Sequence, residues 1–216
     1  MDHREHRCGN SSTVLNELIY HMPYAIFSVA LALGMLSVLY SVMSIEEIHS
    51  KSDILFHSFH FLHLVFASTG AFIIYLRYSS SVLRGFIVSL FSTVIFCTLS
   101  DVILPYCAGL ILGVHMHIHF CFLTELQNVV PFVCVGLLNG YIVHRNAVGL
   151  WDSKVFHFAH TLVSALASLF YVVGHGLEHW YVHMGLLFIL LIIAVVIPCT
   201  CADIIVPVFF AKLDKK

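Results

Sequence analysis

The long apolar runs of this chain limit most strongly what it can fold into. Residues 24–43 and 184–210 are each long enough to cross a hydrocarbon core of about 30 Å as a helix, which takes roughly 20 residues. Of the 216 residues, 60% are hydrophobic and only 10% are charged. A water-soluble domain rarely carries so apolar a composition. The sequence therefore predicts an all-α integral membrane protein whose partner is the lipid bilayer.

Polar breaks divide the chain into expected membrane spans. A seventh span would result if residues 106–123 crossed separately. Cytoplasmic loops carry an excess of Lys and Arg, and six spans place nine of the ten such residues on the side of both termini, leaving Lys51 alone opposite. We therefore expect six transmembrane helices in a plasma or inner membrane, with both termini cytoplasmic. The expected spans are 12–43, 54–76, 85–112, 118–143, 155–173 and 184–210.

Charge and cysteine content exclude several other classes of protein. The formal net charge is −2, so nothing indicates a nucleic-acid partner or a polybasic surface module. The seven cysteines lie mostly in apolar runs without a CxxC pair, and we interpret them as buried thiols. Arg4 and Arg7 precede an apolar stretch that is longer than the core of a signal peptide, so we expect that stretch to be retained.

Two segments of the first half recur in the second half, in the same order. Residues 94–105 match residues 196–207 at seven of twelve positions without a gap. Residues 56–68 match residues 156–168, and both copies contain an HxxH pair. Each half therefore carries the HxxH pair first and the pattern Cys-Thr-x-x-Asp-x-Ile-x-Pro afterwards.

A weaker match extends the repeat to the first helix of each half. It aligns Glu17, Leu18 and Pro23 with a second Glu-Leu pair and a proline that begin at Glu125. We interpret residues 1–112 and 113–216 as two three-helix repeats within one membrane domain. Because three is odd, the second copy enters the membrane from the opposite side, so the repeats are inverted.

Inversion places the recurring acids and histidines at two depths, each completed by a glutamate from the other half. The predicted outer metal site consists of His57, His60, Asp101 and Glu125. The predicted inner metal site consists of His157, His160, Asp203 and Glu17.

The chemistry of these sets favours a divalent transition metal. A charged side chain at the bilayer centre costs about 2.5 to 3.5 kcal/mol on insertion scales, so it persists where it is paired, solvated or coordinating. The two histidines of an HxxH pair lie three residues apart and are neighbours on one helix face. Mixed nitrogen and oxygen donors suit Zn, Fe, Mn, Co or Ni, whereas Mg and Ca prefer oxygen alone.

Cysteine and proline residues flank the two aspartates. Cys97 and Cys199 stand one turn before them and could add a soft ligand. Pro105 and Pro207 follow four residues after them, where each removes a backbone donor and should break the helix near the acid.

Several other histidines have no counterpart in the matched segments. His63 extends the first HxxH by three residues, but Val163 stands at the corresponding position. Two further clusters fall on the non-cytoplasmic side, where either could form an outer metal site. They are His115, His117 and His119, and His175, His179 and His183.

The repeat of the ligand set favours a transporter of a divalent transition-metal cation over the alternatives. A membrane-embedded metal-dependent hydrolase or oxidoreductase needs only one active site. A haem b protein would explain facing histidines but not the recurring acids. The sequence leaves open the metal, the direction, a coupling ion and whether the chain forms a homo-oligomer.

Overall fold

The computed structural model describes residues 11–146 and 153–214, and every regular element among them is a helix. Six of its helical segments are long and apolar enough to cross a membrane. The chain is thus an all-α multi-pass membrane protein, as the apolar runs predicted. Residues 112–120, in the region considered for a seventh span, contain no helix and link two of the six spans.

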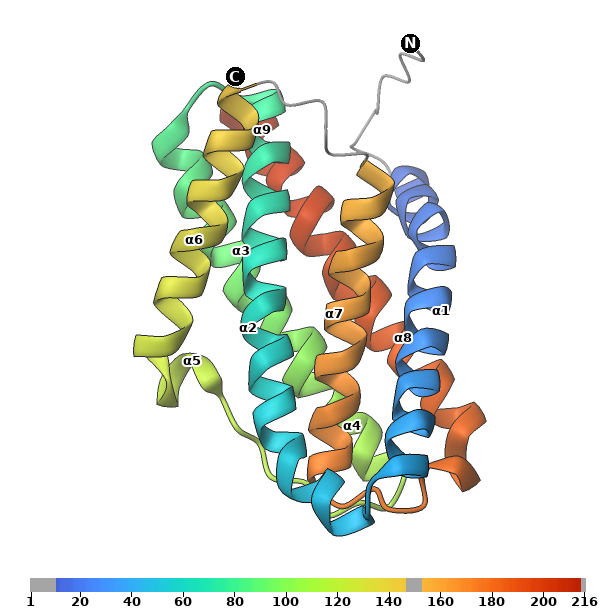
Figure 1. Cartoon of the computed structure of the whole chain (residues 1–216). Coiled ribbons are helices and arrows are strands. Elements are labelled where there is room, and N and C mark those ends of the chain that lie inside the picture. The colour runs from blue at the N-terminus through green and yellow to red at the C-terminus, as the bar shows by residue number, and fades with distance from the viewer. Residues whose placement is uncertain (1–10, 147–152, 215–216) are drawn as a thin grey trace.

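The spans alternate in direction between two ends of a helical bundle (Figure 1). We call the end where α1 begins and α9 ends the terminal end, and the opposite one the loop end. The first three spans are α1 (Ser11–Val42), α2 (Ile45–Tyr78) and α3 (Val82–Thr98), the last of which continues through η1 (Leu99–Ile103) into α4 (Leu104–Ile111). The short α5 (Cys121–Thr124) precedes α6 (Leu126–Arg145).

The last two spans complete the bundle. They are α7 (Ser153–Gly174) and α8 (Met184–Thr200), and η2 (Trp180–His183) precedes α8. The chain then continues through η3 (Cys201–Ile205) into α9 (Val206–Asp214). Spans α1, α2 and α3 run opposite to α6, α7 and α8 respectively (Figure 1). This order of directions is the one that an inverted repeat requires, although the repeat itself stays a prediction.

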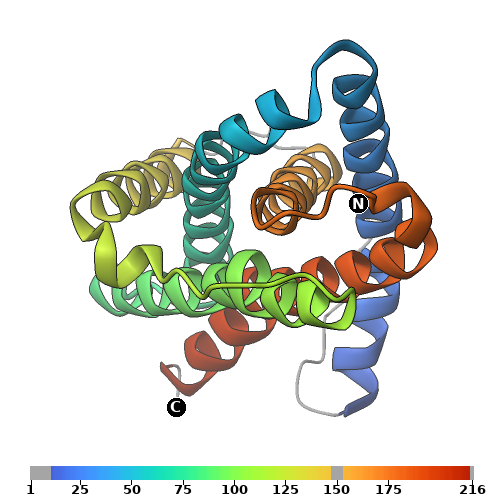
Figure 2. The same cartoon turned by 90° about the horizontal axis from the view of Figure 1, so that it is seen from below.

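Helices α2 and α7 form the centre of the bundle. Within their most apolar windows, 61% and 72% of residues are buried, against 28–44% for the other spans. Figure 2 shows α7 surrounded by α1, α2, α4 and α8 in a view along the bundle. Large apolar side chains such as Leu83 and Leu123 are instead more than two-thirds exposed. Exposed apolar side chains outside, and polar side chains kept within a mostly apolar interior, are what a lipid solvent favours.

Two of the spans contain a widened helical turn at an aspartate. In η1 the N–H of Leu104 donates to the carbonyl of Leu99, five residues back instead of four. Pro105 explains this break, because it has no N–H to donate and its ring would clash with the carbonyl of Asp101. In η3 the N–H of Val206 likewise donates to Cys201, and Pro207 follows in the same position.

Serines from neighbouring helices satisfy the carbonyls that these turns release. The Ser168 hydroxyl donates to the Ser100 carbonyl at 2.9 Å, and the Ser92 hydroxyl donates to the Ala202 carbonyl at 3.0 Å. A buried carbonyl without a partner would cost free energy. The two turns are therefore built into the packing of α7 and α3, and they fix where the aspartates lie.

Candidate metal centre

Imidazoles and carboxylates form a polar row through the apolar interior, mainly between α2, α7 and the two widened turns. Three sets of side chains in this row have ligand atoms within 4.8 Å of one another. The loop-end group is His57, His119 and Cys121. The central group is His63, His160 and Cys199. The terminal-end group is His157, His160 and Asp203.

Two fully buried imidazoles meet in the central group. His63 Nδ1 donates to Asp101 Oδ2 at 2.7 Å, and His160 Nδ1 donates to Asp203 Oδ2 at 2.5 Å. The Nε2 atoms of the two rings lie 2.7 Å apart. Because each Nδ1 carries the proton that its carboxylate accepts, each neutral ring has a lone pair on Nε2. Two lone pairs at this distance repel, so the 2.7 Å separation fits a proton shared by the two nitrogens, and a metal ion would need the rings to move apart.

Two thiols face the same point. Cys97 Sγ and Cys199 Sγ lie 3.8 Å and 3.7 Å from His63 Nε2. Both cysteines are free and buried. Cys107 and Cys134 are exposed instead, so the prediction of buried thiols is wrong for these two, which the chain presents on its outer surface.

Both oxygens of Asp101 accept hydrogen bonds from donor partners. Oδ2 accepts from His63 and, at 2.9 Å, from His60 Nδ1. Oδ1 accepts from the hydroxyls of Ser100 at 2.7 Å and Ser164 at 3.0 Å. Its side chain is 0% exposed. This carboxylate is therefore held by four hydrogen bonds and has no oxygen directed at an open position.

Asp203 differs in having one oxygen available. Oδ2 accepts from His160 and lies 3.7 Å from His157 Nδ1, whereas Oδ1 is buried without a hydrogen-bond partner. His157 Nε2 is also buried and unpartnered. Gly70 of α2 lies beside this carboxylate, and a Cβ there would sit 3.4 Å from Oδ1. The terminal-end group thus offers both a free oxygen and a free nitrogen.

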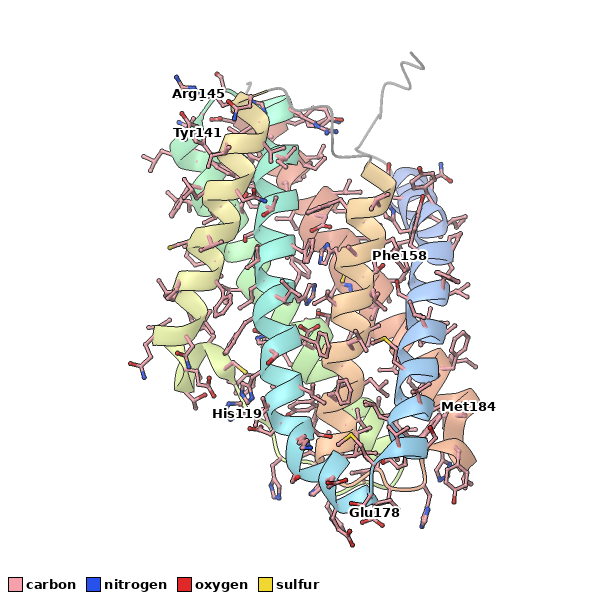
Figure 3. All side chains as sticks on the ribbon, viewed as in Figure 1. His119, Tyr141, Arg145, Phe158, Glu178 and Met184 are labelled. Carbon is pink, nitrogen blue, oxygen red and sulfur yellow. The ribbon has the colours of Figure 1, made fainter. Side chains whose placement is uncertain are left out.

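The loop-end group lies where the segment before α5 passes the start of α2. His57 Nδ1 donates to the Asp53 carbonyl at 2.8 Å, which leaves the lone pair of His57 on Nε2. That nitrogen lies 3.1 Å from Glu125 Oε1, and His119 Nε2 lies 3.6 Å from the same oxygen. Figure 3 shows His119 near this end of the bundle. A proton on this nitrogen makes the contact an ion pair between a positively charged His57 and the Glu125 carboxylate.

Glu125 lies between the spans, at the boundary of the bundle. Partial burial raises the pKa of its carboxyl, but the hydrogen bond from Asn128 and the positive charge of His57 and His119 outweigh burial and hold that pKa below its usual value. The carboxylate is therefore kept in its ionised form, which is the form that binds a cation.

Glu17 lies beyond the terminal-end group. His21 stands one turn further along α1, donates from Nδ1 to the Glu17 carbonyl at 2.6 Å and lies 4.0 Å from the Glu17 carboxylate. The ring centroids of His21 and His157 are 4.0 Å apart. His21 thus stands between Glu17 and the rest of the row.

The structure groups the predicted site residues differently from the two four-residue sets that the sequence predicted. Glu125 contacts His57, and Asp101 contacts His60. These two pairs do not belong to one group whose ligand atoms all lie within 4.8 Å of one another. His157, His160 and Asp203 do form one group. Sequence reasoning gave His63, Cys97 and Cys199 minor roles, although His63 continues the HxxH spacing and each cysteine precedes an aspartate by one turn.

The remaining loop histidines differ in whether they join a candidate metal group. His119 joins the loop-end group, whereas His175 directs Nδ1 at the Tyr171 carbonyl and Nε2 at the His117 carbonyl, at 2.7 and 2.9 Å. Both nitrogens of His175 are therefore engaged with the backbone. Among the described residues, none of the three groups includes His115, His117, His179 or His183.

Comparison of the chain with protein-family models, curated proteins and solved structures finds no match. Fold and site therefore define the class on their own. The chain is a multi-pass helical membrane protein whose interior holds histidine, cysteine and aspartate groups that could bind a metal ion.

Proposed function

We propose that this protein transports a divalent transition-metal cation across the membrane. The observation that carries this proposal is the succession of three candidate metal groups along the bundle interior. Ionisable side chains inside a membrane mark ion pathways in many transporters, because they are too costly to keep there without a role. One catalytic metal would need one such group, whereas a path needs several.

His160 links two of the groups and supports a hand-off between them. Its Nε2 faces the central group, and its Nδ1 faces Asp203 in the terminal-end group. An ion that leaves the centre therefore finds its next donors around the same imidazole. The loop-end group, whose His57 and His119 contact the ionised Glu125, is suited to capture the ion at the opposite end.

The two widened turns supply the places where the spans could bend. Alternating access requires one end of the path to close as the other opens, and broken helices near the membrane midplane are a common means of doing so. Each break carries one of the two aspartates. We propose that the predicted inverted repeats rock about these breaks.

Haem binding fits the central histidines poorly. In haem binding, the porphyrin plane would lie between the two rings, and each Nε2 atom would bind the iron. Two bonds of the length typical for metal-bound imidazole would separate the Nε2 atoms by about 4 Å. The observed separation is 2.7 Å, and thiols occupy the adjacent space.

Proton transfer is the second candidate function, because an unbroken chain of hydrogen bonds runs from Asp101 through His63 and His160 to Asp203. Such chains relay protons in pumps and transporters. This function needs no metal, so a flux assay in the absence of metal separates it from the first.

The test uses protein reconstituted in liposomes that contain a zinc-sensitive dye or a pH-sensitive dye. Asp101→Asn and Asp203→Asn keep the side-chain size but remove a charge, and we expect each to abolish zinc flux, since both positions lie on one path. Glu46→Gln, an exposed change in the first turn of α2, is the matched control and should retain flux.

Three outcomes would overturn the proposal. Normal zinc flux in Asp203→Asn would mean that the ion does not pass the terminal-end group. Rapid proton flux without metal, together with no zinc flux in the wild-type protein, would establish the proton relay instead. Loss of a chemical turnover in Asp101→Asn alone, without any zinc flux in the wild type, would indicate the metalloenzyme.

A further inference from the structure

We infer that the central group is a thiolate–imidazole zinc site, in which His63, His160, Cys199 and Cys97 are the ligands and the two aspartates orient the imidazoles. This inference deepens the proposed function by naming the class of cation on the path, and its place on that path rests on the proposed function. The binding site itself requires only the geometry of the buried side chains.

The positions of three donor atoms, those of His63, His160 and Cys199, are close to the positions around tetrahedral zinc. Bonds of 2.0–2.1 Å to nitrogen and about 2.3 Å to sulfur, at a tetrahedral angle, place nitrogen and sulfur about 3.6 Å apart. Cys199 Sγ lies 3.7 Å and Cys97 Sγ lies 3.8 Å from His63 Nε2. Only Cys199 belongs to the group whose ligand atoms all lie within 4.8 Å of one another, so Cys97 has to move toward the ion to become the fourth ligand. The same geometry places two nitrogens about 3.3 Å apart, so the rings, now at 2.7 Å, need to part by only about 0.6 Å.

Asp101 and Asp203 already lie where a carboxylate would support a metal-bound histidine. Metal-bound histidine almost always donates its second ring N–H to a carboxylate or carbonyl, which fixes the tautomer and strengthens the ligand. His63 and His160 each do so, to Asp101 and Asp203 respectively. Asp101 has no oxygen left for the metal, because His60 and two serines occupy the rest.

The two cysteines reach this point for a reason visible in the fold. Each stands one turn before its aspartate, on a span whose widened turn follows directly. The widened turns direct both aspartates toward the α2–α7 interface. The cysteines face the same interface, where both sulfur atoms lie near His63 Nε2. Residues that correspond in the sequence match thus converge on one ion.

Soft donors and local charge together select the metal. Thiolate and imidazole ligands favour Zn(II) and Cu(I), whereas Mn(II), Mg(II) and Ca(II) favour oxygen. Among the described residues, no lysine or arginine is buried near Asp101 and Asp203. The two carboxylates and two thiolates carry four negative charges, so a divalent ion leaves less buried negative charge than a monovalent ion, and this favours Zn(II) over Cu(I).

The test uses the purified protein in detergent with a reductant, titrated with CoCl2 as a spectroscopic probe. We expect one tetrahedral Co(II) site, seen as intense visible bands and a near-ultraviolet thiolate-to-cobalt band, both removed by one equivalent of ZnCl2. Cys199→Ser should weaken the near-ultraviolet band, and Cys97→Ser/Cys199→Ser should abolish it. Circular dichroism and thermal melting confirm that the variants remain folded, and the alanine versions serve where serine does not fold.

Two further cysteines provide the controls. Cys107→Ser, at an exposed position of α4, should leave the spectrum unchanged. Cys134→Ser, at an exposed position of α6, should also leave the spectrum unchanged. If the band disappears with either control or survives in Cys97→Ser/Cys199→Ser, the central assignment is wrong.

The affinity for Co(II) and the positions of its visible bands test the role of Asp101 separately. Asp101→Asn should weaken Co(II) binding by roughly 10- to 100-fold, the usual effect of losing a carboxylate behind a ligating histidine, while the positions of the visible bands stay the same. Shifted bands would make Asp101 a direct ligand.

Binding and flux can fail separately. A normal cobalt spectrum without zinc flux in liposomes would retain the site and reject transport. Zinc flux that persists in Cys97→Ser/Cys199→Ser would retain transport and show that the central group does not lie on its path.

Discussion

The two widened turns share a backbone plan but present their aspartates differently. Asp101 and Asp203 each lie within a turn that a proline four residues later forces open, and each accepts a hydrogen bond from a buried histidine. Yet Asp101 has four donors around it, whereas Asp203 retains a buried oxygen without a partner.

The cause of this difference lies at positions that differ between the matched segments. Ser100 corresponds to Ala202, and Ser164 corresponds to Leu64. The two hydroxyls that saturate Asp101 Oδ1 therefore have apolar counterparts at the second turn. The comparison teaches that one kind of helix break can hold either a fixed structural carboxylate or an available one, depending on two hydroxyl groups.

The largest expected effect comes from removing each carboxylate. Asp101→Leu leaves His60, His63 and two serines without their acceptor, and breaking a buried pair in this way costs roughly 3–5 kcal/mol. Asp203→Leu deprives mainly His160 of its partner and should destabilise less. Unfolding in a detergent and denaturant series measures both free energies. Equal losses would mean that the four hydrogen bonds of Asp101 contribute no more than the fewer contacts of Asp203.

An intermediate effect is expected from exchanging the residue before each aspartate. Ser100→Ala removes one donor from Asp101, and hydrogen bonds to charged groups contribute roughly 1.5–3 kcal/mol. Ala202→Ser adds a hydroxyl within reach of Asp203 Oδ1. We expect Ser100→Ala to lower the melting temperature, and Ala202→Ser to raise it while weakening zinc flux. A serine at position 202 that leaves zinc flux untouched would show that the free oxygen of Asp203 has no part in transport.

The smallest effect concerns a third carboxylate, Glu125, whose pKa lies below its usual value. A lowered pKa contributes stability above the pKa of the unfolded chain, and this contribution is lost as the pH falls through the folded value. Asn128→Ala removes one cause of the lowering, so Glu125 should protonate at a higher pH than in the wild type. The infrared carbonyl band of the protonated carboxyl, assigned with Glu125→Gln, measures this. An unchanged titration would mean that the Asn128 hydrogen bond does not influence Glu125.

The sequence by itself determined the class of fold and the places where two spans break. Apolar length is a local property, and it predicted six spans that the structure contains. A proline acts on the carbonyl four residues before it, so Pro105 and Pro207 already indicated where the helices would open. The orientation of the termini and the inverted repeat rest on charge distribution and sequence matching, and they stay predictions.

Only the tertiary structure decided which donors meet. His63 has no counterpart in the repeat, yet the packing of α2 against α7 places its Nε2 beside that of His160. His119 reaches His57 because the segment before α5 returns to the start of α2. Spacing along a helix predicts which residues share its face, but contacts between helices depend on depth, rotation and packing of the whole bundle. For that reason the ligand types could be predicted, whereas their grouping into sites could not.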